Sequence, residues 1–136
     1  MSQQIEVISC FLECDGCLLL LKRSQEVGSY RGQWATVSGY VEDLPPDEQA
    51  LVELSEELSL GEADLRLVRK GEPLKVFDRK LQIRWIINPY LFSVENKEKV
   101  CLDWEHEDSR WIDPAELDDY ETVPKLKESL ARVWHL

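Results

Sequence analysis

The chain has 136 residues, of which 43% are hydrophobic and 32% charged, values typical of one globular domain over residues 1–136. Its net charge of −11 argues against non-specific binding to nucleic acid or anionic membranes, because such binding needs basic patches. The sequence contains neither an apolar run of about 18 residues nor the pattern of a secretory signal, so we expect a cytoplasmic protein without a membrane span.

The first two predicted strands form a β-hairpin. Residues 4–14 place apolar side chains at alternate positions, as a half-buried strand does. Residues 17–23 contain four consecutive leucines, which is typical of a central strand buried on both faces. Asp15-Gly16 between these runs is a strong signal for a two-residue turn. The two strands are therefore expected to be antiparallel neighbours.

The four cysteines raise the alternatives of a zinc site or a redox site. Cys14 and Cys17 have the Cys-x-x-Cys spacing of such sites, and the predicted turn places them opposite each other across the hairpin. A zinc site needs a second pair of ligands, and only Cys10 and Cys101 remain, well separated in sequence. We therefore expect reduced structural thiols, with a cross-strand disulfide under oxidation as the alternative.

A polar loop over residues 24–32 and a short strand over residues 34–38 come next. Arg23 and Arg31 frame the loop, and arginines at strand ends that face a cleft can hold phosphate by bidentate contact. Two exposed surface arginines are the alternative. Trp34, at the start of the short strand, is a candidate for stacking on a base or sugar or for filling the core.

A helix is predicted over residues 46–60, because Pro46 suits its first position and Gly61 is expected to stop it. Its apolar residues recur at helical spacing and form one stripe: Ala50, Leu51, Leu54 and Leu58. Glu53, Glu56 and Glu57 share another face. Like charges at this spacing oppose helix formation by roughly 0.2–0.5 kcal/mol per pair, which a hard cation such as Mg²⁺ or Mn²⁺ would relieve. A merely solvated glutamate face is the alternative.

Two further extended segments follow the helix. Residues 64–74 are expected to form a strand or an extended connection, and residues 75–94 carry the longest strand pattern. Pro89 interrupts that pattern, so a bulge or an edge position is expected there. The apolar run 81–87 offers a contact for a second copy of the chain, and a homodimer is one expectation.

The polar face of the long strand carries candidate ligand-binding residues. Arg79, Gln82 and Arg84 lie on this face, and their donors are suited to an anionic ligand.

The C-terminal part is expected to contain a short strand over residues 109–112 and two helical segments. Asp113 is suited to cap a helical turn that Pro114 opens, and Thr122 to cap the last helix. The last helix has an apolar stripe that should pack on the sheet: Val123, Leu126, Leu130, Val133 and Trp134. The order of strands, helix, strands, helix predicts an α/β protein with a mixed sheet between helices.

Residues 32–60, GQWATVSGYVEDLPPDEQALVELSEELSL, resemble the Nudix hydrolase signature. Gly39 matches the opening glycine of the signature, and residues 53–60 match its helical end. The resemblance implies a strand–loop–helix unit that binds divalent metal, with Gly39, Glu53, Glu56 and Glu57 at the metal site. It also implies the Nudix fold, an α/β/α sandwich with a mixed β-sheet between helices.

The chain departs from the signature at three places. Val52 stands where the family has an arginine that supports the glutamates, and Ser59 stands where it has a glycine. The loop after Gly39 is one residue short, so that Glu42 or Asp43 would have to replace the loop glutamate. These departures motivate a second hypothesis, a Nudix-like nucleotide-binding or sensor domain without catalysis. The intact glutamate trio favours the enzyme.

Residues 103–113, DWEHEDSRWID, resemble another segment of Nudix proteins, in which a glutamate joins the metal site or acts as general base. This resemblance makes Glu105 the fourth candidate for the active site. His106 has the unperturbed pKa that suits proton transfer. A surface loop is the alternative for both residues.

Together these resemblances imply a hydrolase that cleaves the diphosphate linkage of a nucleoside diphosphate joined to another moiety. They imply Mg²⁺ or Mn²⁺ as the cofactor and a small-molecule nucleotide as the partner. The candidate substrate-binding residues are Arg23, Arg79 and Arg84 for the leaving phosphate and Trp34, Phe77 and Trp85 for the nucleoside.

Overall fold

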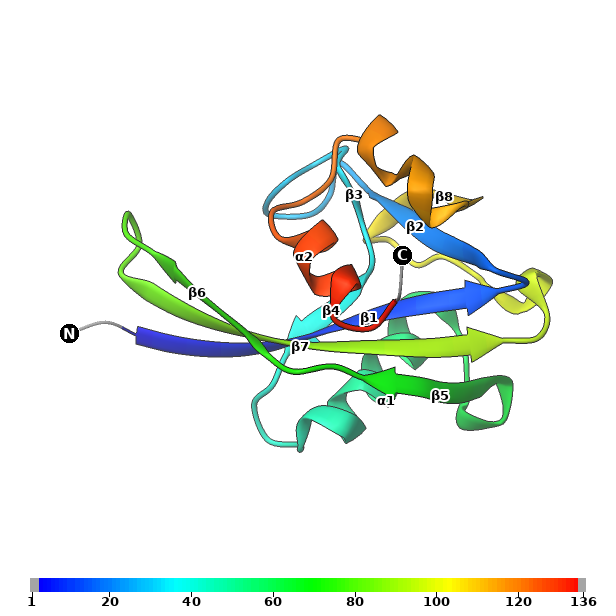
Figure 1. The fold of residues 1–136 in the computed structure, drawn as a ribbon, viewed down its shortest axis with the longest axis horizontal. Coiled ribbons are helices and arrows are strands. Elements are labelled where there is room, and N and C mark those ends of the chain that lie inside the picture. The colour runs from blue at the N-terminus through cyan, green and yellow to red at the C-terminus, as the bar shows by residue number, and fades with distance from the viewer. Residues whose placement is uncertain (1–2, 135–136) are drawn as a thin grey trace.

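One mixed sheet of eight strands organises the chain, in a computed structural model that describes residues 3–134 (Figure 1). The strands are β1 (Gln3–Cys14), β2 (Cys17–Arg23), β3 (Trp34–Ala35), β4 (Val37–Tyr40), β5 (Leu65–Lys70), β6 (Leu74–Asp78), β7 (Ile83–Val94) and β8 (His106–Ile112). The α-helices are α1 (Pro46–Leu58) and α2 (Leu126–Ala131), and the 3₁₀ helices are η1 (Glu62–Asp64), η2 (Lys97–Lys99) and η3 (Pro114–Asp119). The main strand order is β3-β2-β1-β7-β5, with β4 paired to β1, β6 to β7 and β8 to β2. The long strands β1 and β7 run parallel at the centre.

The first hairpin forms as predicted. Cys14 pairs with Cys17 across β1 and β2, and both thiols are free. Asp15 and Gly16 have φ values of 52° and 79°, which are the left-handed conformations that a two-residue turn of this kind requires. The turn therefore explains why these two cysteines lie opposite each other, and the expectation of reduced structural thiols stays a prediction.

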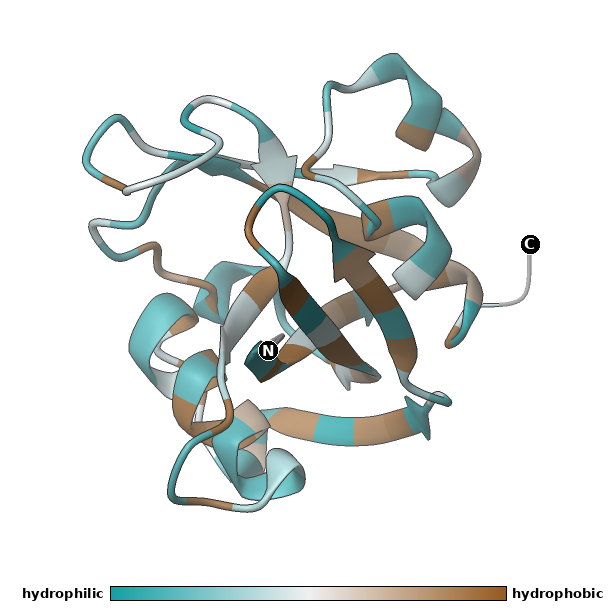
Figure 2. Ribbon diagram, turned by 90° about the vertical axis from the view of Figure 1, so that its left-hand side faces the viewer, coloured by the Kyte–Doolittle hydropathy of each residue, from teal (hydrophilic) through white to brown (hydrophobic). Residues whose placement is uncertain are grey.

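Both faces of the sheet are covered by helices, as the sequence predicted. Side chains alternate between the two faces along each central strand, so both faces carry apolar residues that need cover. The cluster beneath α1 includes Ile8, Cys10, Leu12, Leu19, Leu21, Ala50, Leu54 and Leu58. The cluster beneath η3 and α2 includes Phe11, Leu18, Leu20, Trp34, Leu117, Leu126 and Leu130. Figure 2 shows hydrophobic strands at the centre and more hydrophilic helical surfaces around them. No helix of residues 3–134 is both long and apolar enough to cross a membrane.

Helix α1 ends two residues earlier than predicted. Its last helical residue is Leu58, and Ser59 adopts a left-handed conformation with a φ of 61°. The Ser59 N–H donates to the Ser55 carbonyl, and the Leu60 N–H donates to the Leu54 carbonyl. Gly61 is therefore not the stop. The conformation of Ser59 explains why a glycine would suit this position, since glycine adopts it without steric cost.

Two predicted strands are each divided in the structure. The short strand of residues 34–38 is two strands, because β3 pairs with β2 whereas β4 pairs with β1. The pattern over residues 75–94 is also two strands, β6 and β7, which form an antiparallel hairpin around Gln82 with a φ of 54°. Alternation of apolar residues continues through the turn, so the pattern does not reveal the reversal. The homodimer contact predicted for residues 81–87 stays a prediction.

Pro89 lies neither at a bulge of β7 nor at an edge of the sheet, contrary to the prediction. Strand β7 has β1 on one side, while on the other side its partner changes from β5 to β6. Pro89 lies at this change, and its carbonyl accepts a hydrogen bond from the Gly71 N–H at 3.0 Å. Proline has no N–H to donate. At this position none is needed, because the ladder is already interrupted at the connection between β5 and β6.

The C-terminal caps were predicted only in part. Asp113 caps η3, because its side chain accepts a hydrogen bond from the Ala115 N–H. Thr122 does not cap α2, which begins at Leu126. Thr122 instead forms an isolated parallel bridge with Trp34, so the segment before α2 is held against β3 by backbone contacts.

Candidate active site

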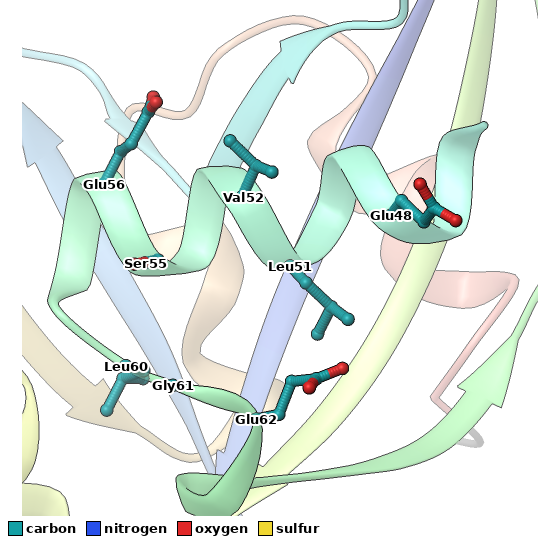
Figure 3. Close-up of a pocket in the computed structure, with 8 residues that line it drawn as sticks. All are labelled: Glu48, Leu51, Val52, Ser55, Glu56, Leu60, Gly61 and Glu62. Carbon is teal, nitrogen blue, oxygen red and sulfur yellow. The ribbon is translucent and has the colours of Figure 1, made fainter. Parts of the chain in front are cut away.

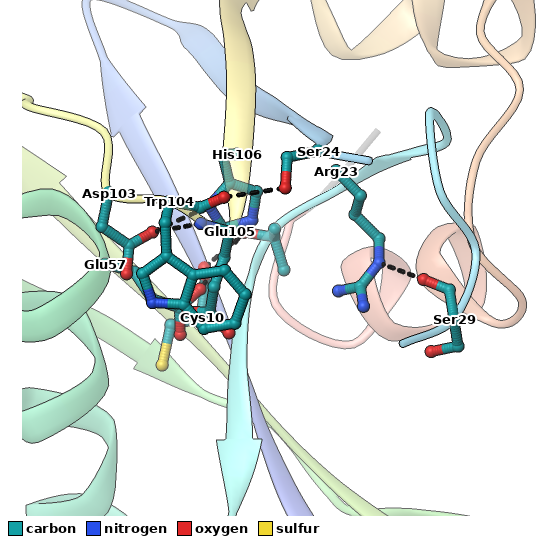
Figure 4. A network of polar contacts seen from close by, with 10 residues as sticks. Cys10, Arg23, Ser24, Ser29, Glu57, Asp103, Trp104, Glu105 and His106 are labelled. Carbon is teal, nitrogen blue, oxygen red and sulfur yellow. Dashed lines mark hydrogen bonds and ion pairs between the residues drawn. The ribbon is translucent and has the colours of Figure 1, made fainter. Parts of the chain in front are cut away.

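The candidate site forms where the chain before β8 joins the end of α1. The Cys101 N–H donates to the Leu58 carbonyl at 3.0 Å, and the Asp103 N–H donates to the Glu57 carbonyl at 3.2 Å. The last carbonyls of a helix have no partner within it, so this segment satisfies two of them. The same contacts bring Glu105, distant in sequence, beside the glutamates of α1 (Figure 4).

Glu57 is the buried centre of this cluster, with 2% of its surface exposed. Its Oε1 lies 3.8 Å from Nε2 of His106, and its Oε2 has no hydrogen-bond partner among the described residues. Burial, the charge of Glu105 and a carboxyl hydrogen bond with Glu53 raise the pKa of Glu57 to about 10. A buried carboxyl oxygen without a partner is costly, so this group is suited to accept a ligand that the protein itself does not supply.

Glu53 packs directly against the backbone of β4. A Cβ atom added to Gly39 would lie 2.3 Å from the Glu53 carboxyl group, so only glycine leaves room for it. Gln49 holds the carboxylate from the same helix by donating to Oε1 at 3.1 Å. Burial raises the pKa of Glu53, although its side-chain hydrogen bonds with Glu57 and Gln49 oppose the rise. The role of Gly39 is therefore close approach, since its φ is not in the left-handed region.

Glu56 differs from Glu53 and Glu57 because its side chain is exposed to solvent. It lines a shallow surface groove with Val52, Leu51 and Glu62. Figure 3 shows Glu56 and Val52 on the same side of α1. The family has an arginine at the position of Val52. In this chain the groove therefore has a small apolar side chain in place of a positively charged guanidinium group.

Glu105 sits in a turn that is anchored at three points. Its N–H donates to Oδ1 of Asp103 at 3.0 Å, and its carbonyl accepts from the N–H of Ser24 at 2.8 Å. The Ser24 hydroxyl also donates to the carbonyl of Trp104 at 2.7 Å. Burial and the charges of Asp103 and Glu53 raise the pKa of Glu105, whereas Arg23 lowers it. The turn is thus held rigidly at the edge of the cluster.

His106 lies beneath the cluster at the start of β8 and is 5% exposed. Burial lowers its pKa to about 4, so the imidazole is neutral at physiological pH. Its Nδ1 has no hydrogen-bond partner among residues 3–134 and lies 3.9 Å from Oδ1 of Asp103. This geometry suits a neutral group that supports Glu57 more than an exposed proton donor.

Among the arginines predicted from the sequence, the structure brings only Arg23 close to the cluster. Arg23 pairs with His106 across β2 and β8, and its Nε donates to the Ser29 carbonyl at 2.9 Å. Arg79 and Arg84 belong to the β6–β7 hairpin, which projects beyond the body of the sheet (Figure 1). Arg31 holds its own loop through the Val27 carbonyl.

The predicted aromatic residues lie elsewhere. Trp34 is 9% exposed and belongs to the core beneath α2, where its ring makes an edge contact with Tyr120 at 5.3 Å. Phe77 and Trp85 lie on β6 and β7 of the projecting hairpin, where Phe77 pairs with Arg84 and Trp85 pairs with Val76. Sequence reasoning missed Asp103 and Trp104, because both lie in an irregular turn without any periodic pattern.

The donor set of the cluster fits a hard divalent cation. The carboxyl groups of Glu53, Glu57, Glu105 and Asp103 are oxygen donors, the type of ligand that Mg²⁺ and Mn²⁺ prefer. Burial and charge repulsion raise the pKa values of Glu53, Glu57 and Glu105, and a bound cation would relieve the repulsion. As these side chains stand, no three His, Cys, Asp or Glu residues within the described range surround a common point.

The pH dependence of stability provides a test of the raised pKa of Glu57, which burial and the neighbouring carboxyl groups cause. Glu57 keeps its proton up to about pH 10 when folded but loses it near pH 4.5 when unfolded, so stability falls as pH rises between these values. His106 acts in the opposite direction, but only between about pH 4 and pH 6.5. In EDTA, the free energy of unfolding should therefore fall between pH 6.5 and about 8.5, by up to about 1.4 kcal/mol per pH unit.

Urea denaturation at three pH values would measure this slope. The Glu57→Gln variant should show a flatter dependence, because glutamine does not titrate. A wild-type stability that rises over this range would contradict the raised pKa of Glu57.

The mixed sheet between helices and the acidic centre on α1 define an α/β protein with a carboxylate-based candidate active site. A family model described as the NUDIX domain matches residues 3–133. The chain therefore belongs to the Nudix family, as the signature over residues 32–60 indicated.

Several known proteins are similar along nearly the whole chain. A protein of Salmonella paratyphi B named nucleoside triphosphatase NudI is 28% identical, with 95% of this chain and 96% of the relative covered. A MutT Nudix hydrolase structure from Burkholderia pseudomallei is 25% identical with a TM-score of 0.69, covering 98% of this chain and all of that one. A MutT protein structure from Methanosarcina mazei is 20% identical and shares the fold with a TM-score of 0.76, covering 97% and 94%.

Proposed function

We propose that the protein uses Mg²⁺ or Mn²⁺ to hydrolyse the diphosphate linkage of a nucleoside diphosphate joined to another moiety. The observation that supports this proposal best is the unpartnered Oε2 of Glu57, buried within a cluster of carboxyl groups. Nucleoside triphosphates belong to this substrate class, the further moiety being a phosphate. The relative named nucleoside triphosphatase makes them the first substrates to test.

In this proposal the carboxylates of Glu53, Glu57 and Glu105 hold the cation, and Glu56 at the exposed edge completes the set from α1. When bound, the cation offsets the charge of the diphosphate and polarises phosphorus. This compensation is needed because the chain carries a net charge of −11. A bound cation would also offset the repulsion among these carboxyl groups, which disfavours their clustering in the metal-free protein.

The same proposal assigns the remaining steps to groups around the cation. The half-buried Glu105 accepts the proton of the attacking water, since it lies at the edge of the cluster rather than beneath it. Water oxygen bonds to phosphorus as the bridging phosphorus–oxygen bond breaks, which gives two phosphate-terminated fragments. Arg23, at the end of β2, steadies the leaving phosphate by charge-assisted hydrogen bonds.

A hydrolysis panel tests the proposal. The purified protein would be incubated with a nucleoside triphosphate, a nucleotide sugar and a dinucleoside polyphosphate, each with Mg²⁺, with Mn²⁺ or with EDTA. We expect turnover with at least one substrate, at least about 100-fold above the EDTA control. The metal alone should also raise the melting temperature, because it binds the folded protein preferentially.

The second candidate function is nucleotide binding without catalysis, and Val52 is the observation that favours it. In that case no substrate would turn over, whereas a nucleotide would still raise the melting temperature. This outcome would reject hydrolysis, whereas the expectation that the protein binds a nucleotide would stand. Restoring the family residue with Val52→Arg would then show whether the missing arginine is the cause.

A further inference from the structure

Trp104 is an exposed tryptophan beside the acidic cluster. It is 65% exposed, whereas Trp34 is buried and the three other tryptophans, Trp85, Trp111 and Trp134, are half-buried. An indole has a large flat apolar surface, so an exposed indole next to a candidate site offers a ligand a face on which to stack.

The position of Trp104 is fixed by its backbone. Its carbonyl accepts a hydrogen bond from the hydroxyl of Ser24, which is 7% exposed, and the next carbonyl along the chain accepts from the Ser24 N–H. The residue before it, Asp103, donates its N–H to the Glu57 carbonyl at 3.2 Å. Trp104 is therefore one residue from a direct contact with α1, on an anchored turn. Figure 4 shows Trp104 on the segment that also carries Asp103, Glu105 and His106.

We infer that the Trp104 indole is the surface on which the nucleobase of the substrate stacks while the glutamates of α1 face its phosphates. The inference rests on the proposed function and names the residue that selects nucleoside-bearing substrates. Asp103 and Glu105 precede and follow Trp104 in the chain, so an anionic group without a cation is disfavoured beside the indole, whereas a nucleobase is flat and neutral. Every base has a π face, so stacking selects for a base but tolerates different ones.

Fluorescence tests the contact without turnover. Adenosine monophosphate should quench the tryptophan fluorescence of the wild-type protein, whereas ribose 5-phosphate, which lacks a base, should not. The Trp104→Phe variant should lose this quenching, because Trp104 is the most exposed of the five tryptophans, whereas quenching at any of the other four would persist. Equal quenching in the variant, or none in the wild type, would overturn the inference.

Kinetics test the consequence for specificity. With the best nucleotide of the hydrolysis panel, Trp104→Ala should raise KM about ten- to one-hundredfold and change kcat little, while Trp104→Phe should stay within about threefold. Leu81→Ala is the matched control, since Leu81 is also apolar and 62% exposed but lies in the β6–β7 connection.

The failures of the two proposals can be distinguished. A wild-type protein that turns over no substrate rejects the proposed function, and the fluorescence result then decides whether Trp104 still stacks on a base. Turnover with an unchanged KM in Trp104→Ala, or with an equal change in Leu81→Ala, rejects the role of Trp104 alone.

Discussion

Replacing Glu57 with glutamine is expected to lower kcat/KM by about 1,000-fold or more while the protein stays folded. Glutamine has nearly the same shape but lacks the negative oxygen that a hard cation prefers. The fold should tolerate the change, because the Glu57 carboxyl is buried and its raised pKa keeps it neutral in the metal-free protein. Rates with Mg²⁺ and with Mn²⁺, together with circular dichroism and thermal melting, measure both parts of this result.

The matched control for this change is Glu48→Gln on the same helix. Glu48 is exposed, and its replacement removes the same charge without touching the buried cluster. Its kcat/KM should stay within about twofold of the wild-type value. A Glu57→Gln variant that keeps the wild-type rate would remove Glu57 from the proposed mechanism. Loss of the metal-dependent rise in melting temperature in Glu57→Gln alone would place the defect in metal binding.

The second large effect is expected from Gly39→Ala, which should lower kcat/KM by about 100-fold. The new Cβ atom would lie 2.3 Å from the carboxyl group of Glu53, so the glutamate must move away from β4. Since the obstructing atoms belong to the flexible Glu53 side chain and not to the backbone, the side chain can move, which displaces one of the proposed ligands. Activity should therefore fall much more than the free energy of unfolding, which urea denaturation measures.

Gly28→Ala provides the control for a glycine replaced in open space. A Cβ atom at Gly28 would meet no atom within 4 Å, and its backbone does not require a positive φ. This variant should keep wild-type activity and stability. If Gly39→Ala were fully active, the close approach of β4 to Glu53 would have no role in positioning the ligand. If it unfolded instead, the contact would be structural, and the milder Glu53→Gln variant would then test the ligand itself.

Local patterns were sufficient for the parts of the fold in which neighbouring residues decide the conformation. The Asp15-Gly16 turn gave the first hairpin, since both residues tolerate a positive φ. The apolar stripe gave α1 and the face it buries, where Ala50, Leu54 and Leu58 pack on the sheet. The β6–β7 hairpin was missed, because alternating apolar residues on both sides of a turn look the same as one long strand.

The candidate site was only partly accessible to the same reasoning. Helical spacing grouped Glu53, Glu56 and Glu57 on one face, but spacing alone does not show that Glu57 is buried while Glu56 is exposed. That difference depends on which side of the face the chain before β8 covers. Asp103 could not be predicted for the same reason, since its position follows from the bond between its N–H and the Glu57 carbonyl.

The sequence by itself determined the family, the helix that carries the glutamates and the glycine that precedes it, because these features lie within one continuous segment of about thirty residues. Only the tertiary structure decided which acidic groups repel each other, and which tryptophan stays exposed beside them. Burial and charge repulsion act between side chains brought together in space, and here the joining contacts link α1 to residues more than forty positions later. No local pattern contains that pairing, so the electrostatics of the site follow from the fold.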